Sequence, residues 1–388
     1  MIHLVFVHGV NTRYSNNDPL NDAEVVGRQG AFTKYCFGNG KVTYYEPYWG
    51  LHGPPQRDTW NSLPGTDDVL LAIGGGIGAV QANAIASENH LLAAAQKDFG
   101  GLLNSLSLTL IQDGVSENDK KLADAIGTYA ADIDSDGETS TAPNWINEIT
   151  SDTELIERIE QEVTPFIEGQ PVVALGFGNW IGGKLQSAKN RVLGAGISLI
   201  DDRLVKWIRG FTPNLAVFLG DAFIYIKQDQ PRENIRAAVL SKILDAARAA
   251  KQDQGKLILV CHSMGANIVY DLLNDPTVIQ NLNHQLGQPF KVDLLLTVGT
   301  QVGLFQELNL FANPIPSHLS DMRCDHWWHV YNRMDILSFA AKEVFNGLDI
   351  KQFRVDTSAN ILKAHSAYFL SPVFQKRLAK RLQSAGLI

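Results

Sequence analysis

The segment that decides the fold is Lys256–Asn267, KLILVCHSMGAN. Its first part, Leu257–Val260, is apolar and contains β-branched residues, as a buried strand does, and Ala266–Leu273 suits a helix. An abrupt turn, Cys-His-Ser-Met-Gly, joins the two and has Ser263 at its centre. A strand, a tight turn around a serine and a helix form a nucleophile elbow, which holds the serine hydroxyl above the carboxyl edge of a sheet.

Small residues are required on both sides of such a serine, because the helix and the strand come very close there. Gly265 meets this requirement on the helix side, whereas Cys261 stands where the pattern has glycine. The motif is therefore G-x-S-x-G with one departure. The alternative interpretation is a Ser-Gly turn that only ends an ordinary buried strand.

Composition limits the partners of the chain. Its 388 residues are 45% hydrophobic and 19% charged, with a formal net charge of −8. Length favours two or three domains, although one α/β domain with insertions also reaches this size. The acidic balance argues against nucleic acid as a partner, which needs a basic face, and against general attraction to anionic membranes.

The cysteines and the amino terminus indicate a cellular location. Cys36, Cys261 and Cys324 cannot form a disulfide framework and lack metal-ligand spacing. They favour a reducing compartment, and we expect a cytoplasmic protein. The first residues, MIHLVFVHGV, lack the basic region and cleavage site of a signal peptide and fit a first strand better.

Alternating strands and helices indicate an α/β core formed by both ends of the chain, 1–57 and 214–388. Apolar runs without alternation predict strands buried on both faces, so we expect a mainly parallel sheet flanked by helices. The predicted strands are Ile2–Val7, Lys41–Trp49, Leu257–Val260, Val292–Val298, His326–Tyr331 and Phe353–Val355. The predicted helices of the core are Asp22–Phe37, Pro231–Lys251, Ala266–Leu273 and Pro372–Ala385, and the alternation resumes after the insertion with Leu215–Ile226.

Residues 58–213 break this alternation and are predicted to form a large, mostly helical insertion. Val69–Ala86 approaches the length of a membrane span, but polar residues interrupt it and no basic cluster flanks it. We therefore expect a buried or lid helix and no stable span, which leaves room for transient membrane contact. Trp145–Val163 suits a polar amphipathic helix, and Gly176–Ile208 is again apolar. Such insertions often act as a cap or lid over an active site, the alternative being a packing domain that never touches substrate.

An acidic stretch in the insertion, Asp132–Gly137, matches the first half of an EF-hand calcium loop. Pro143 stands where the loop needs its bidentate glutamate, so we expect a solvated acidic loop. Calcium binding is the open alternative.

A serine nucleophile needs a base to take its proton and a third group to hold that base in the right tautomer. Elbow hydrolases carry these groups in the order serine, acid, histidine. Asp335 follows the predicted strand His326–Tyr331, and His365 follows Phe353–Val355. Both lie just beyond carboxyl ends of strands, at the edge where the elbow lies. We predict Ser263, Asp335 and His365 as catalytic residues.

Alternatives to these assignments exist. Asp335 could cap its own loop, with Asp325 as a weaker rival acid, and His365 could be a surface histidine. His262 is expected to pack in the elbow, because strand neighbours point to opposite sides. Cys261 precedes the turn and should be buried, so we reject it as a nucleophile.

Acyl transfer also needs two donors for the developing oxyanion. The N–H of Met264 is the first. The loop after the first strand, His8-Gly9-Val10, supplies the second through the N–H of Val10, because glycine before it lets that amide turn inward.

Together these motifs resemble the α/β-hydrolase superfamily, in particular its bacterial lipase-like and esterase-like members. VFVHGV is similar to the oxyanion strand of that family, LILVCHSMGANIVY to its elbow, YNRMDILS to its acid loop and AHSAYF to its histidine loop. The resemblance covers residues 1–49 and 215–388, not the insertion. It implies Ser263 as nucleophile, Asp335 as acid, His365 as base, and Val10 and Met264 as oxyanion amides.

We therefore expect a cytoplasmic serine hydrolase of carboxylic esters that needs no metal or organic cofactor. The apolar, glycine-rich insertion favours a lipid-like or long-acyl substrate. A thioesterase or amidase with the same triad, and an interaction protein that keeps the fold without catalysis, are the alternatives. Natural substrate and oligomeric state have no signal in the sequence.

Overall fold

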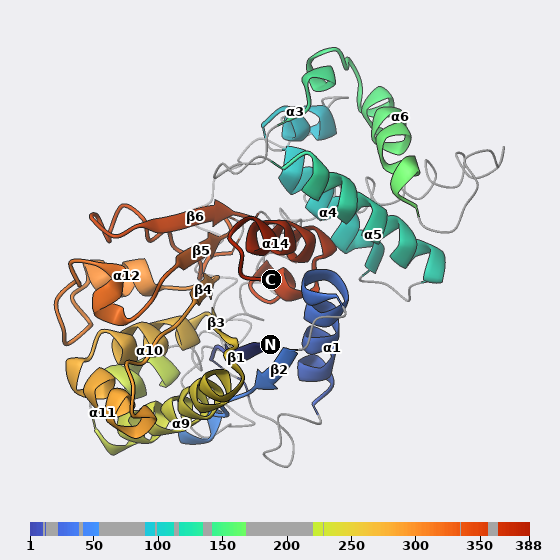
Figure 1. Ribbon diagram of the computed structural model, residues 1–388. Coiled ribbons are helices and arrows are strands. Elements are labelled where there is room, and N and C mark those ends of the chain that lie inside the picture. Colours follow the sequence, from blue (N-terminus) through green and yellow to red (C-terminus); the bar gives the residue numbers. More distant parts are fainter. Residues whose placement is uncertain are drawn as a thin grey trace, which may run out of the picture.

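The molecule is built on a six-stranded sheet in the order β2-β1-β3-β4-β5-β6, in which every pair of neighbours is parallel (Figure 1). The strands are β1 Ile2–Val7, β2 Val42–Tyr45, β3 Lys256–His262, β4 Leu294–Val298, β5 Trp327–Tyr331 and β6 Ile350–Arg354. The computed structural model describes residues 1–10, 12, 22–38, 42–53, 90–97, 99–111, 116–134, 142–167, 220–227, 229–333, 335–355 and 364–388. The predicted α/β fold with a mainly parallel sheet is confirmed.

The order of the strands reverses between β1 and β3. The chain leaves β1 toward β2 on one side and returns to β3 on the other, with Val7 paired to Cys261 at the carboxyl end. Open α/β sheets bind ligands at such a switch point, outside the carboxyl ends of the strands. The loop after β1 and the serine turn after β3 meet at this point.

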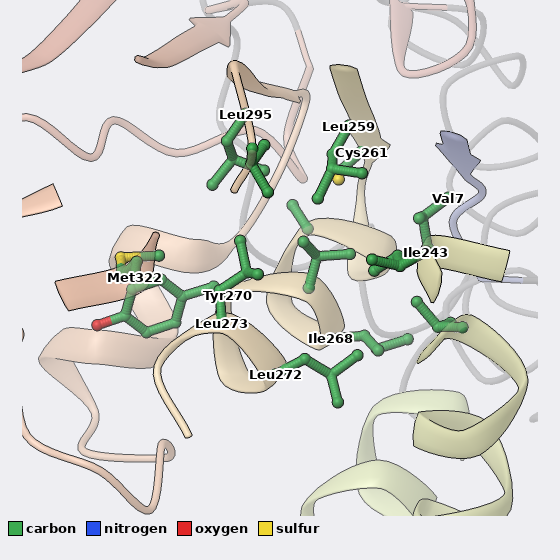
Figure 2. Close-up of a cluster of buried hydrophobic side chains, with 14 of the residues drawn as sticks. Val7, Ile243, Leu259, Cys261, Ile268, Tyr270, Leu272, Leu273, Leu295 and Met322 are labelled. Atoms are coloured by element: carbon green, nitrogen blue, oxygen red, sulfur yellow. The ribbon is translucent and has the colours of Figure 1, made fainter. Parts of the chain in front are cut away.

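Helices cover both faces of the sheet (Figure 1). The first face carries α9 Gln230–Asp253, α10 Met264–Leu273, α11 Pro276–Leu286 and α12 Val302–Glu307, whose apolar side chains pack with those of Leu259 and Cys261. Figure 2 shows part of this cluster, including Tyr270 and Leu295. The second face carries α1 Ala23–Ala31, whose Arg28 lies over the Phe6 ring of β1. The π-helical continuation of α1, Phe32–Phe37, and α14 Pro372–Ser384 pack on the same face with Ile258 and Val260.

The described part of the insertion is helical, as predicted. It contains α3 His90–Lys97, α4 Phe99–Ile111, α5 Glu117–Asp132 and α6 Asp152–Val163, with short 3-10 helices at Asn144–Asn147 and Thr164–Phe166. These helices bury their own apolar cluster, which includes Val373 of α14. A Cβ added to Gly127 of α5 would lie 3.1 Å from Pro372, so the insertion packs closely on α14.

Two predicted segments of the insertion, Val69–Ala86 and Gly176–Ile208, lie outside the described residues, so a cap or lid over the site stays a prediction. None of the helices in the described ranges combines the length and the apolar character that a bilayer span requires.

Several predicted elements differ from the observed ones. Trp145–Val163 is not one helix, because Ser151 caps a new helix by accepting a hydrogen bond from the N–H of Glu154. The strand predicted to continue to Trp49 ends at Tyr45. The segment 220–226 is helical, with Ala222 and Tyr225 buried in the cluster that contains α9.

The expectation of a solvated acidic loop is wrong for Asp134. Its buried carboxylate pairs with Arg377 at 2.9 Å and with Arg381 at 3.0 Å, both from α14. Residues 135–141 lie outside the described residues. Asp134 therefore joins the insertion to the core, and its charge is already compensated by two guanidinium groups.

Candidate active site

The serine turn predicted from the sequence is formed. Ser263 follows β3 with φ 52° and ψ −129°, a conformation that costs a non-glycine residue about 1–3 kcal/mol. The turn is fixed because the N–H of Ser263 donates to Val298 O at 3.1 Å and the N–H of Ala266 donates to Ser263 O at 3.1 Å. The structure thus has a strained serine turn between β3 and α10, as a nucleophile elbow requires.

Two glycines allow this turn to approach β1. A Cβ at Gly265 would lie 2.4 Å from the carbonyl oxygen of Val7, and one at Gly9 would lie 2.7 Å from the Cβ of Ser263. Neither position has room for a side chain. The sequence predicted the close approach at Gly265; at Gly9 the structure shows that the backbone packs directly against the serine.

Cys261, the departure from the glycine pattern, is fully buried in the cluster on the α9 and α10 face, as Figure 2 shows. Burial raises the pKa of its thiol well above the usual range. Its side chain fills space in the core, and a neutral, buried thiol is a poor nucleophile.

Asp335 and His365 meet at the same edge of the sheet. The Nδ1 of His365 donates to Oδ2 of Asp335 at 2.8 Å. Two further donors hold the buried carboxylate: the hydroxyl of Tyr368 at 2.9 Å from Oδ2 and the N–H of Leu337 at 2.9 Å from Oδ1. This bond uses Nδ1 of His365, and the other ring nitrogen, Nε2, takes no part in it. Asp335 therefore does more than cap its loop.

The hydroxyl of Ser263 and Nε2 of His365 are both buried, and neither forms a hydrogen bond with any described residue. In the structure, Asp335 and His365 are hydrogen-bonded and Ser263 lies on the same edge of the sheet. No hydrogen bond connects Ser263 to His365. Catalytic hydrogen bonds are often long or poorly aligned before substrate binds. Contact between this hydroxyl and any ligand requires the groups around it to move.

His262 packs beside the histidine loop. Its Nε2 lies 2.7 Å from the carbonyl oxygen of His365, and the two rings are 4.7 Å apart between centroids. Since a carbonyl can only accept, the proton is on Nε2 of His262. Burial, and then the proximity of His365, lower the pKa of His262 well below its usual value. A neutral His262 therefore fixes the backbone of His365, a contact that the sequence did not reveal.

The loop after β1 contains Val10, whose N–H the sequence predicts as an oxyanion donor, and hydrogen bonds hold the peptide group before it. The carbonyl of Gly9 accepts from Nδ1 of His8 at 2.7 Å and from the hydroxyl of Thr12 at 3.2 Å. In a trans peptide the N–H of Val10 points away from that carbonyl, so these bonds set its direction. Met264 opens α10, and the first N–H groups of a helix have no acceptor within it.

Trp49 supports the same loop and was missed by the sequence analysis. Its ring stacks on His8 at 4.9 Å between centroids, and its Nε1–H donates to His8 O at 2.9 Å. No local pattern could have linked two residues so far apart in the chain.

The rival acid is excluded by its position. Asp325 precedes β5 at the opposite edge of the sheet, where its half-exposed carboxylate pairs with Lys291 at 2.7 Å. Within the described residues, no group of three or more histidine, cysteine, aspartate or glutamate side chains could hold a metal ion.

No protein-family model, no curated protein and no solved structure gives a match to this chain. The chemistry must therefore be inferred from the geometry of this site.

Proposed function

We propose that the protein is a serine hydrolase that cleaves carboxylic esters through an acyl-enzyme. The observation that carries the proposal is the pair formed by the buried Asp335 and the partly buried His365, joined at 2.8 Å on the edge where the strained Ser263 lies. Serine, acid and histidine then follow in the chain order of elbow hydrolases.

In the proposed reaction the hydroxyl oxygen of Ser263 attacks the ester carbonyl while Nε2 of His365 takes its proton. The N–H groups of Val10 and Met264 stabilise the oxyanion that forms. Asp335 holds the imidazolium, which gives its proton to the departing alcohol. Water, deprotonated by the same histidine, then cleaves the acyl-enzyme and restores the serine hydroxyl.

An interaction protein that keeps this fold without catalysis is the second candidate. It is favoured by one observation: the hydroxyl of Ser263 is buried and is not bonded to His365. A thioesterase or amidase would use the same groups, so only relative rates on matched substrates distinguish it from an esterase.

The test is the hydrolysis of nitrophenyl esters of short, medium and long acids by the wild type and Ser263→Ala. Loss of a triad serine lowers kcat by several powers of ten. Ser107→Ala is the matched control, because Ser107 is also buried but lies in α4. Equal rates for wild type and Ser263→Ala would reject the proposal and favour the interaction protein.

The lipid-like or long-acyl preference was inferred from apolar segments that lie outside the described residues, and it stays a prediction that the chain-length series tests. Cytoplasmic location stays a prediction from the cysteines.

A further inference from the structure

A cavity of about 190 Å³ adjoins the serine turn on the face of the sheet that carries α1. Gly9 and His262 line it, and both residues contact the elbow: the Gly9 backbone packs on Ser263, and His262 precedes it. Polar groups, among them Thr12 and Arg28, share the wall with the apolar Phe6 and Leu370. The cavity thus borders the serine turn without being lined by Ser263 itself, and its wall mixes polar and apolar side chains.

Arg28 is the unusual member of this wall. It is only 5% exposed, and its guanidinium lies 3.7 Å above the centroid of the Phe6 ring. Its Nη2 donates to Glu46 at 2.9 Å, whereas its Nε–H is buried and has no hydrogen-bond partner among the described residues. A buried donor without a partner is costly, so an acceptor in the cavity gains a hydrogen bond from Nε–H once a small shift of the Arg28 side chain opens this atom to the cavity.

The charge around Arg28 determines which acceptor fits. Glu46 already neutralises the guanidinium, and the exposed carboxylate of Glu24 also lines the cavity. A second carboxylate or a phosphate would meet no excess positive charge there. A neutral oxygen, such as a ketone, hydroxyl or ether, suits this site better than an anion or a bare hydrocarbon chain.

We infer that this cavity is a substrate subsite that selects esters carrying a short oxygenated group, whose oxygen accepts a hydrogen bond from Arg28. The inference rests on the proposed ester hydrolysis and adds the chemical class of the substrate. Arg28 is then a specificity-determining residue with no part in proton transfer.

The test compares esters of matched shape by release of acid. Methyl 4-oxopentanoate against methyl pentanoate probes the acyl side, and 2-methoxyethyl butanoate against butyl butanoate probes the alcohol side. We expect the wild type to prefer one oxygenated ester by about tenfold in kcat/KM, the effect of one hydrogen bond to a charged group. Arg28→Lys, which removes Nε–H and keeps the charge, should abolish that preference and change the rate on the hydrocarbon ester less than threefold.

Arg381→Lys is the matched control, because Arg381 also stacks on an aromatic ring, Phe353, at 3.9 Å and pairs with a buried carboxylate, but lines no part of this cavity. It should leave the preference intact. No preference in the wild type for either oxygenated ester, or an unchanged preference in Arg28→Lys, would overturn the inference.

A second variant covers the case in which Arg28→Lys does not fold. Leu370 is 53% exposed, so Leu370→Trp should fold and narrow the cavity. Leu370→Trp should lower kcat/KM on the preferred ester at least fivefold and leave kcat/KM on methyl acetate unchanged. Leu308→Trp, at a position that is 57% exposed and does not line the cavity, should leave both values unchanged. Equal losses on both esters would overturn the subsite. Hydrolysis that survives Ser263→Ala would instead reject the proposed function itself.

Discussion

Gly9→Ala is the sharpest probe of the contact between the loop after β1 and the serine. The new Cβ would lie 2.7 Å from the Cβ of Ser263 and 3.2 Å from its hydroxyl oxygen. Carbon atoms in contact prefer about 3.5–4.0 Å, so the two backbones must separate by about 1 Å. A displacement of this size at a reacting group costs about a hundredfold in rate.

The cost in stability should be smaller than the cost in rate. Overpacking a buried site by one methyl group destabilises by about 1–3 kcal/mol, which leaves a folded protein. We therefore expect kcat/KM on a nitrophenyl ester to fall about a hundredfold while the urea unfolding midpoint falls only modestly.

Gly30→Ala provides the control for this experiment. Gly30 lies in α1, and a Cβ there would have no atom within 4 Å. Alanine in a helix is more stable than glycine by about 0.5–1 kcal/mol, so this variant should be fully active and slightly stabilised. Gly9→Ala with more than half of the wild-type kcat/KM would refute the close packing of Gly9 on the serine.

Three further predictions concern groups outside the proposed reacting atoms. Asp134→Ala removes the carboxylate that Arg377 and Arg381 of α14 share, and it should cost about 3–5 kcal/mol in urea unfolding. The exposed Asp132→Ala should cost little, and equal effects would contradict the buried pairing. Burial lowers the pKa of His329 from 6.5 to about 4. Between these two pH values the unfolded chain binds a proton at this histidine that the folded chain does not bind, so the free energy of unfolding falls as the pH drops from 6.5 to about 4. When the pH is lowered from 7 to 5, the free energy of unfolding measured with urea should fall by about 2 kcal/mol less in His329→Gln than in the wild type. Identical losses in the two proteins would rule out the lowered pKa of His329. All three cysteines are buried, and burial raises the pKa of Cys324 to about 12, so a thiol reagent at pH 8 should react only after denaturation; rapid labelling of the native protein would disprove this.

The part of the site that the sequence predicted depends on local patterns. Apolar runs located β1, β3 and β4, because strands buried on both faces need apolar residues throughout. The serine turn was equally visible, since a strand and a helix flank it directly. Chain order then pointed to Asp335 and His365, and the structure brings these two into contact.

The contacts that the sequence did not reveal are long-range. Tyr368 donates to Asp335, and Trp49 stacks on His8, but neither residue stands out in a local pattern. The two arginine partners of Asp134 come from a helix more than two hundred positions later, so this one carboxylate of a stretch that suggested solvent or calcium is instead buried in an ion pair. Such pairings are decided by the packing of whole helices, which periodicity within one segment does not encode.

The most direct test of the proposed function is covalent labelling of the full-length protein by a nitrophenyl alkylphosphonate, followed by mass spectrometry of its peptides. The oxygen of Ser263 should attack phosphorus and release nitrophenol, which leaves one phosphonyl group on the peptide that contains Ser263. The adduct should be absent in Ser263→Ala and should form at least a hundredfold more slowly in His365→Ala, because the histidine takes the proton. A folded wild type that stays unmodified, or an adduct on another residue, would contradict the serine hydrolase proposed here.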